Sequence, residues 1–187
     1  MNANANTSTN SSPNIGMVDE ETATRFIETP IGPITLIASD HGLRAVMWPG
    51  EAPGRVTLER GDESAASPAA EAILETAAGQ LDEYFGGERT EFDVPLDPIG
   101  TDFQQSAWAA LRTIPYGETI SYGEQAARVG DRRKARAVGA ANGRNPISII
   151  VPCHRVVGSN GSLTGFAGGL ENKAWLLDHE RSVRWRP

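Results

Sequence analysis

Residues 149–156 read IIVPCHRV, an apolar run that ends at Pro152 and then presents the only cysteine of the chain, Cys153. Pro152 suits the first position of a helical turn, where backbone N–H groups favour a thiolate. Arg155 adds a positive charge, which we expect to lower the pKa of the thiol further. Successive side chains of an extended strand point to opposite faces, so Cys153 can work with His154 as its base only if the chain turns here.

A nucleophile and a base usually need a third group that orients the base. The amphipathic stretch LENKAWLLDHERS, residues 170–182, predicts a helix that carries Glu180. From spacing alone, Glu180 could equally be an exposed residue near a helix end. A lone cysteine is also more often a small buried hydrophobe than a nucleophile, so both interpretations stay open at this point.

Composition indicates a globular chain of one large or two small domains, with 187 residues, 39% of them hydrophobic and 22% charged. One cysteine excludes an internal disulfide, and the spacing of His41, His154 and His179 predicts no metal site; we expect no cofactor. The N-terminus lacks the cationic start and apolar segment of a secretory signal, and no run approaches ~20 apolar residues. We therefore expect a cytoplasmic protein without a membrane partner.

The charge of the chain is unevenly distributed. The net charge is −7, yet residues 126–156 hold seven basic side chains and one acidic one. This distribution is compatible with a cationic, nucleic-acid-binding surface or with an ordinary solvated loop.

The first half of the chain predicts an α+β unit. Residues 1–20 are rich in Asn, Ser and Thr and predict a disordered tail. Residues 24–48 contain short apolar runs broken by PIGP and DHG, which predict a small antiparallel sheet. A helix is expected over residues 68–86, from a proline to two glycines. We place the N-terminal unit at residues 21–100 and a helical unit, with an active-site loop, at residues 101–187.

The second half predicts a helix-turn-helix. Residues 101–111 place apolar side chains on one helix face, and Thr101 or Asp102 can cap this helix. The stretch from Tyr116 to Pro146 divides at Gly130 into a short helix, a turn and a second short helix. Ordinary helical hairpins show the same pattern, so this feature alone does not establish DNA binding.

Several motifs occur together in a fixed order: IPYGETISYG, RAVG, N-P, PCHRV and a helix that ends in glutamate. In this combination, residues 101–180 resemble the O6-alkylguanine-DNA alkyltransferases. TPIGPITL is typical of the N-terminal part of that family, a ribonuclease-H-like sheet with a helix. The resemblance does not reach the tail before Thr22.

The resemblance implies single-turnover DNA repair, in which an alkyl group moves from O6 of guanine in duplex DNA to Cys153. Whether O4 of thymine is also a substrate stays open. Within the family pattern, His154 resembles a water-linked base, Glu180 the carboxylate that orients it, and Asn145 the residue that braces the reactive segment. A soft thiolate suits displacement at an sp3 carbon, and a thioether is not hydrolysed afterwards.

The resemblance also implies a DNA-binding mode. Tyr122 matches a phenol that hydrogen-bonds the flipped nucleotide, and Arg136 matches the side chain that fills the space the base leaves. Small side chains would let the recognition helix approach a minor groove ~6 Å wide. The remaining expected contacts come from this helix and the active-site region: Ala135, Ala137, Gly139, Val156, Phe166 and Ala167. A monomer without an obligate protein partner is expected.

One position departs from the family pattern. Phe166, followed by Ala167, stands where many members have a tyrosine, so we expect slower transfer. Because of this change, a second function remains compatible with the sequence: a non-catalytic sensor of alkylated DNA. Such sensors commonly lack the cysteine. A helix-turn-helix regulator would need a dimer and a preferred DNA sequence, and a Cys-His-Glu hydrolase would leave the DNA-binding segment unexplained.

Overall fold

The structure is a computed structural model that describes residues 22–51, 54–56 and 67–184. The tail expected over residues 1–20 lies outside the described residues. The elements follow the order β1 (Ala23–Ile27), β2 (Ile34–Ala38), β3 (Leu43–Met47), α1 (Pro68–Gly86), α2 (Asp102–Leu111), β4 (Ile120–Ser121), α3 (Tyr122–Arg128), η1 (Arg132–Lys134), α4 (Ala135–Gly143), η2 (Cys153–Arg155), β5 (Val156–Val157) and α5 (Leu170–Arg184).

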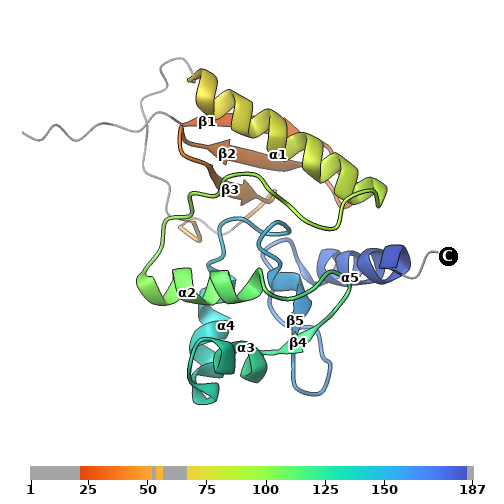
Figure 1. Cartoon of the computed structure of the whole chain (residues 1–187). Helices are drawn as coiled ribbons and strands as arrows, with labels where there is room; N and C mark the ends of the chain where they lie inside the picture. The colour runs from red at the N-terminus through yellow and green to blue at the C-terminus, as the bar shows by residue number, and fades with distance from the viewer. Residues whose placement is uncertain (1–21, 52–53, 57–66, 185–187) are drawn as a thin grey trace, which may run out of the picture.

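The N-terminal part is a two-layer unit, in which α1 lies along one face of the sheet (Figure 1). The strands pair antiparallel in the order β1-β2-β3, so the expected small antiparallel sheet is confirmed. Leu74, Ala77 and Leu81, one face of α1, are fully buried in the core that α1 forms with the sheet. The α+β class is thereby confirmed.

The ends of α1 follow from its sequence. The Ser67 side chain accepts a hydrogen bond from the amide of Ala70, and Pro68 occupies the start of the helix, as expected. Gly87 ends the helix with a φ of 77°, a left-handed conformation that glycine adopts without steric cost. These signals place Tyr84 in the last turn, from which it reaches the second half of the molecule.

The outer edge of β3 connects the sheet to the segment that precedes the cysteine. The amide of Val46 donates to the carbonyl of Pro146 at 2.8 Å, and Val46 forms a parallel bridge with Ile147. The amide of Leu43 donates to the carbonyl of Pro95 at 2.8 Å, so β3 also contacts the segment between α1 and α2. The sheet therefore anchors the backbone that leads into the site.

The C-terminal part gathers short helices below the sheet (Figure 1). Thr101 and Gln104 cap α2 reciprocally, and Trp108 is buried with its Nε1 donating to the carbonyl of Ala141 on α4 at 2.9 Å. Helix α3, a turn with η1, and α4 form the expected helix-turn-helix. No helix within the described ranges is both long enough and apolar enough to cross a membrane.

Candidate active site

The cysteine lies at the start of a tight turn. Cys153 opens η2, and its amide donates to the carbonyl of Val151 at 2.8 Å. The chain therefore turns where the joint action of Cys153 and His154 requires it. The thiol is free and its residue is 6% exposed, so the sulfur is nearly enclosed by protein.

Asn145 braces the loop that precedes the turn. Its Nδ2 donates to the carbonyl of Val151 at 2.8 Å, and its Oδ1 accepts from the amide of Ile147 at 3.1 Å. Between these contacts Ile149 has a φ of 74°, which a β-branched residue rarely adopts and which costs of order 1–3 kcal/mol. The two hydrogen bonds and the burial of Ile149 hold the loop in this conformation.

His154 and Glu180 form a fully buried pair. The Nε2 of His154 lies 2.7 Å from Oε1 of Glu180, and both side chains are 0% exposed. Burial lowers the pKa of His154, and the negative charge of Glu180 partly opposes this effect. A neutral imidazole with its proton on Nε2 fits these contacts. Its Nδ1 is buried and has no hydrogen-bond partner among the described residues.

Glu180 is held as a carboxylate by several donors. Burial by itself raises the pKa of Glu180, but the charges and hydrogen bonds of His154 and Arg155 outweigh it and hold the pKa well below the ordinary range. The Nε of Arg155 donates to Oε2 at 2.9 Å, and the amide of Gly117 donates to the same oxygen at 2.9 Å. Glu180 is therefore a buried partner of His154, and the alternative interpretation of Glu180 as an exposed residue near a helix end is wrong.

The expectation that the thiol of Cys153 has a lowered pKa is wrong. The guanidinium of Arg155 donates to Glu180 and to the carbonyl of Ile114, and burial raises the pKa of the Cys153 thiol. Hydrogen bonding from Asn145 and the positive charge of Lys173 act in the opposite direction. The turn positions the thiol, but the cations that favour its thiolate come from elsewhere in the fold.

Lys173 is the functional candidate that sequence reasoning missed. Its side chain is fully buried, and its Nζ donates to the carbonyls of Val156 and Thr164, both at 2.7 Å. A usable signal was present, because Lys173, Leu176, Leu177 and Glu180 share the buried stripe of α5. A lysine on such a stripe indicates a specific partner, since an unpaired buried ammonium is costly.

An open apolar pocket of about 390 Å³ lies at the helix-turn-helix. It brings together four of the residues expected to contact DNA and two from the loop before α5: Tyr122, Ala135, Arg136, Gly139, Thr164 and Gly165. The Tyr122 hydroxyl donates to the carbonyl of Thr164 at 3.3 Å. Ala137 is exposed on α4 but does not line this pocket, and Val156 is fully buried.

Phe166 forms part of an aromatic wall between the sheet and the imidazole. Its ring packs edge-on against Trp48 with a centroid distance of 5.6 Å and lies 6.3 Å from the ring of His154. Ala167 is partly buried against the same core. A Cβ at Gly168 would lie 2.7 Å from the Trp48 ring, so this loop and the end of the sheet fit closely.

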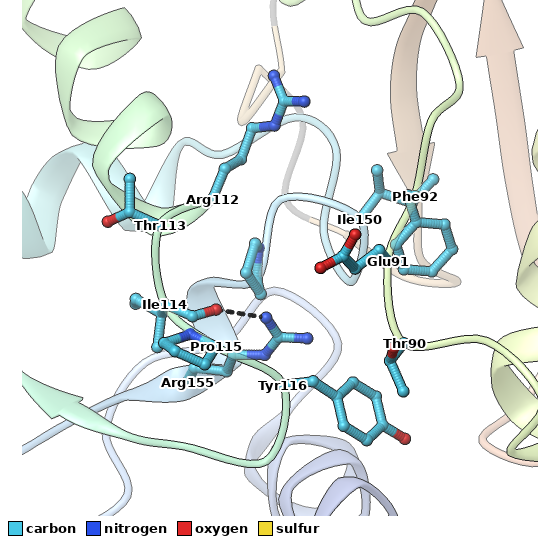
Figure 2. A pocket seen from close by; sticks show the side chains of 11 residues that line it. Thr90, Glu91, Phe92, Arg112, Thr113, Ile114, Pro115, Tyr116, Ile150 and Arg155 are labelled. Carbon is cyan, nitrogen blue, oxygen red and sulfur yellow. Dashed lines mark hydrogen bonds between the residues drawn. The ribbon is translucent and has the colours of Figure 1, made fainter.

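A second pocket of about 480 Å³ is lined on one side by Arg155 of the η2 turn (Figure 2). The segments 90–92 and 112–116 form its walls, together with Ile150, Pro152 and Arg155. Figure 2 shows Arg155 donating to the carbonyl of Ile114, at 2.7 Å. Neither Cys153 nor His154 lines this pocket.

Comparison with known families places both halves of the chain. Residues 23–98 match the model described as 6-O-methylguanine DNA methyltransferase, ribonuclease-like domain. Residues 102–182 match the model described as 6-O-methylguanine DNA methyltransferase, DNA binding domain. The fold and these matches define a DNA-binding methyltransferase.

Similar proteins agree with the family models. The chain is 50% identical over 157 residues to a Methanosarcina acetivorans protein named methylated-DNA–protein-cysteine methyltransferase, covering 84% of this chain and 97% of that one. A Mycobacterium tuberculosis protein with the same name is 53% identical over 163 residues, covering 84% and 92%. The crystal structure of Mycobacterium tuberculosis OGT in complex with DNA matches with a TM-score of 0.73 and 50% identity, over 86% and 93% of the chains. The chain belongs to the 6-O-methylguanine DNA methyltransferase family.

Proposed function

We propose that this chain repairs alkylated DNA by moving a methyl or larger alkyl group from O6 of guanine to the sulfur of Cys153, once per protein molecule. The family makes the chain a methylated-DNA–protein-cysteine methyltransferase with DNA as its partner. The observation that carries the assignment to Cys153 is its place on the Asn145-braced turn, directly before a His154 that is hydrogen-bonded to Glu180.

The proposed reaction is an in-line displacement. The thiol of Cys153 loses its proton through a water molecule to Nδ1 of His154, and the sulfur attacks the alkyl carbon. The carbon–sulfur bond forms as the bond from carbon to O6 breaks, and O6 keeps the electron pair. Guanine takes up one proton, which balances the proton that left the thiol. The thioether product is not hydrolysed, so the protein acts once.

The proposed DNA complex uses the minor groove. Ala135, Ala137 and Gly139 on α4 allow close approach of the helix backbone to the groove. Arg136 is exposed and would fill the stack after the base is flipped, while Tyr122 would hydrogen-bond the flipped nucleotide. The exposed cations around η1 would contact phosphates, which predicts weaker binding as salt rises.

We also propose how the chain is organised in the cell. A free acceptor thiol suits the reducing cytoplasm, and the reaction requires neither a cofactor nor a second subunit, so a monomer suffices. Residues 21–100 would support the site, and residues 101–187 would bind DNA and accept the alkyl group. The matched ranges 23–98 and 102–182 support this division.

The experiment is an intact-mass measurement after mixing the protein with duplex DNA that carries one O6-methylguanine. We expect one added methyl group per protein, mapped to Cys153, and none in a Cys153→Ser variant. Lesion binding without a mass increase in the wild type would instead indicate the sensor alternative, which the Phe166 position keeps open. Repeated turnover of an ester would indicate a hydrolase.

A further inference from the structure

Tyr84 brings α1, a helix of the sheet unit, into contact with the buried carboxylate. Its hydroxyl donates to Oε1 of Glu180 at 2.9 Å, across 96 residues of sequence. We propose that Tyr84 is a positioning residue for alkyl transfer, because its hydroxyl holds Glu180 in the orientation that presents Oε1 to His154. This inference rests on the proposed roles of His154 and Glu180.

Hydrogen-bond donors surround both oxygens of the Glu180 carboxylate. Oε1 accepts from Tyr84, from Nε2 of His154 at 2.7 Å and from Nη2 of Arg155 at 2.9 Å. Oε2 accepts from Nε of Arg155 and from the amide of Gly117, each at 2.9 Å. A carboxylate offers about four acceptor sites, so these donors occupy all of them. Removing the Tyr84 hydroxyl would leave only His154 and Arg155 as donors to Oε1, the oxygen that contacts the imidazole.

Tyr84 is itself held rigidly. The side chain is fully buried, and its ring lies 5.4 Å from the rings of Phe85, Phe92 and His179 and 5.9 Å from that of Tyr116. Burial and the charge of Glu180 raise the pKa of Tyr84 well above the ordinary value, so the phenol stays protonated and donates. Packing thus fixes a donor at one oxygen of the carboxylate.

The hydroxyl also influences the base. His154 faces the charge of Glu180 and the opposing charges of Arg155 and Lys173, and Tyr84 faces Glu180, Arg155 and Tyr116. The Tyr84 phenol donates a hydrogen bond to Oε1 and so stabilises part of the negative charge of Glu180. This leaves less of that charge to stabilise a protonated His154. Without the Tyr84 hydroxyl, the pKa of His154 should rise. As pH falls, the imidazole should then become protonated at a higher pH than in the wild type and stop acting as a base.

The test compares Tyr84→Phe with Phe92→Leu in single-turnover transfer from O6-methylguanine DNA. Tyr84→Phe keeps the ring and removes only the hydroxyl. We expect roughly tenfold slower transfer, unchanged affinity for lesion DNA, and an acidic limb of the pH–rate profile that moves to higher pH. Phe92→Leu loosens the same aromatic cluster without touching Glu180, so it should lower the melting temperature but leave the pH–rate profile unchanged.

A Glu180→Gln background separates this inference from the function it rests on. If Tyr84 acts through the carboxylate, Tyr84→Phe should slow Glu180→Gln no further. A Tyr84→Phe protein with the wild-type rate and profile, beside a slow Glu180→Gln protein, would overturn the role of Tyr84 alone. A Glu180→Gln protein as fast as wild type would overturn the proposed relay itself. If Phe92→Leu shifted the pH–rate profile as much as Tyr84→Phe does, the effect of Tyr84 would come from packing in the aromatic cluster and not from its hydroxyl.

Discussion

Replacing Lys173 with methionine tests how a buried cation supports the thiol. Methionine keeps most of the side-chain volume but removes two hydrogen bonds of 2.7 Å, to the carbonyls of Val156 and Thr164. Hydrogen bonds to a charged group contribute about 1.5–3 kcal/mol each, and the burial that lowers the pKa of Lys173 offsets part of that gain. We expect the free energy of unfolding, measured in urea, to fall by about 2–4 kcal/mol.

The same substitution should change the reactivity of the thiol. The charge of Lys173 lowers the pKa of Cys153 against the effect of burial, so Lys173→Met should raise that pKa and reduce the thiolate fraction. The assay is the rate of Cys153 alkylation by iodoacetamide as a function of pH, read by mass. Arg25→Met is the control, because Arg25 on β1 pairs with Glu71 on α1, and this ion pair includes no residue of the turn that carries Cys153. A Lys173→Met thiol that titrates like the wild type would refute the reasoning.

Four further outcomes are expected. Because the pKa of Glu180 is depressed in the folded protein, the stability that Glu180 contributes is present above about pH 4.3 and is lost as pH falls below this value. In Glu180→Gln, the free energy of unfolding in urea should therefore change less with pH below about pH 4.3 than in the wild type. Asn145→Ala removes two buried hydrogen bonds of a strained loop and should lower the free energy of unfolding by about 2–4 kcal/mol, with a matching loss of transfer. Phe166→Tyr should speed transfer in the single-turnover assay, and an unchanged rate would contradict the expected cost of phenylalanine. Gly168→Ala should lower the melting temperature, since its Cβ would lie 2.7 Å from the ring of Trp48.

Local signals in the sequence predicted the elements well. The serine, proline and glycines around residues 67–87 define the ends of α1, and the Thr101 capping signal begins α2 at the expected place. The glycine at position 130 separates α3 from the turn that leads to α4, as the helix-turn-helix pattern predicted. Such features depend on backbone conformations within a few neighbouring residues, which is why the sequence reveals them.

The sequence predicted the electrostatic interactions of the site less well than it predicted the helices. Arg155 follows the cysteine directly, so sequence proximity suggested that its charge acts on the thiol, but the structure directs the guanidinium to Glu180. Lys173 lies 20 positions from the cysteine in sequence and was overlooked. Charge acts through space, and the three-dimensional distance between two groups bears little relation to their separation along the chain.

The sequence by itself indicated a turn after Pro152, the residue types of the site and the family to which the chain belongs. Ordered motifs and turn signals are local, so they can be read without knowing what packs against them. Only the tertiary structure decided which groups meet, because His154 and Glu180 are 26 residues apart and Tyr84 and Glu180 are 96 apart. Burial of these groups together sets their protonation, since desolvation and opposing charges act only once the two halves of the molecule have packed.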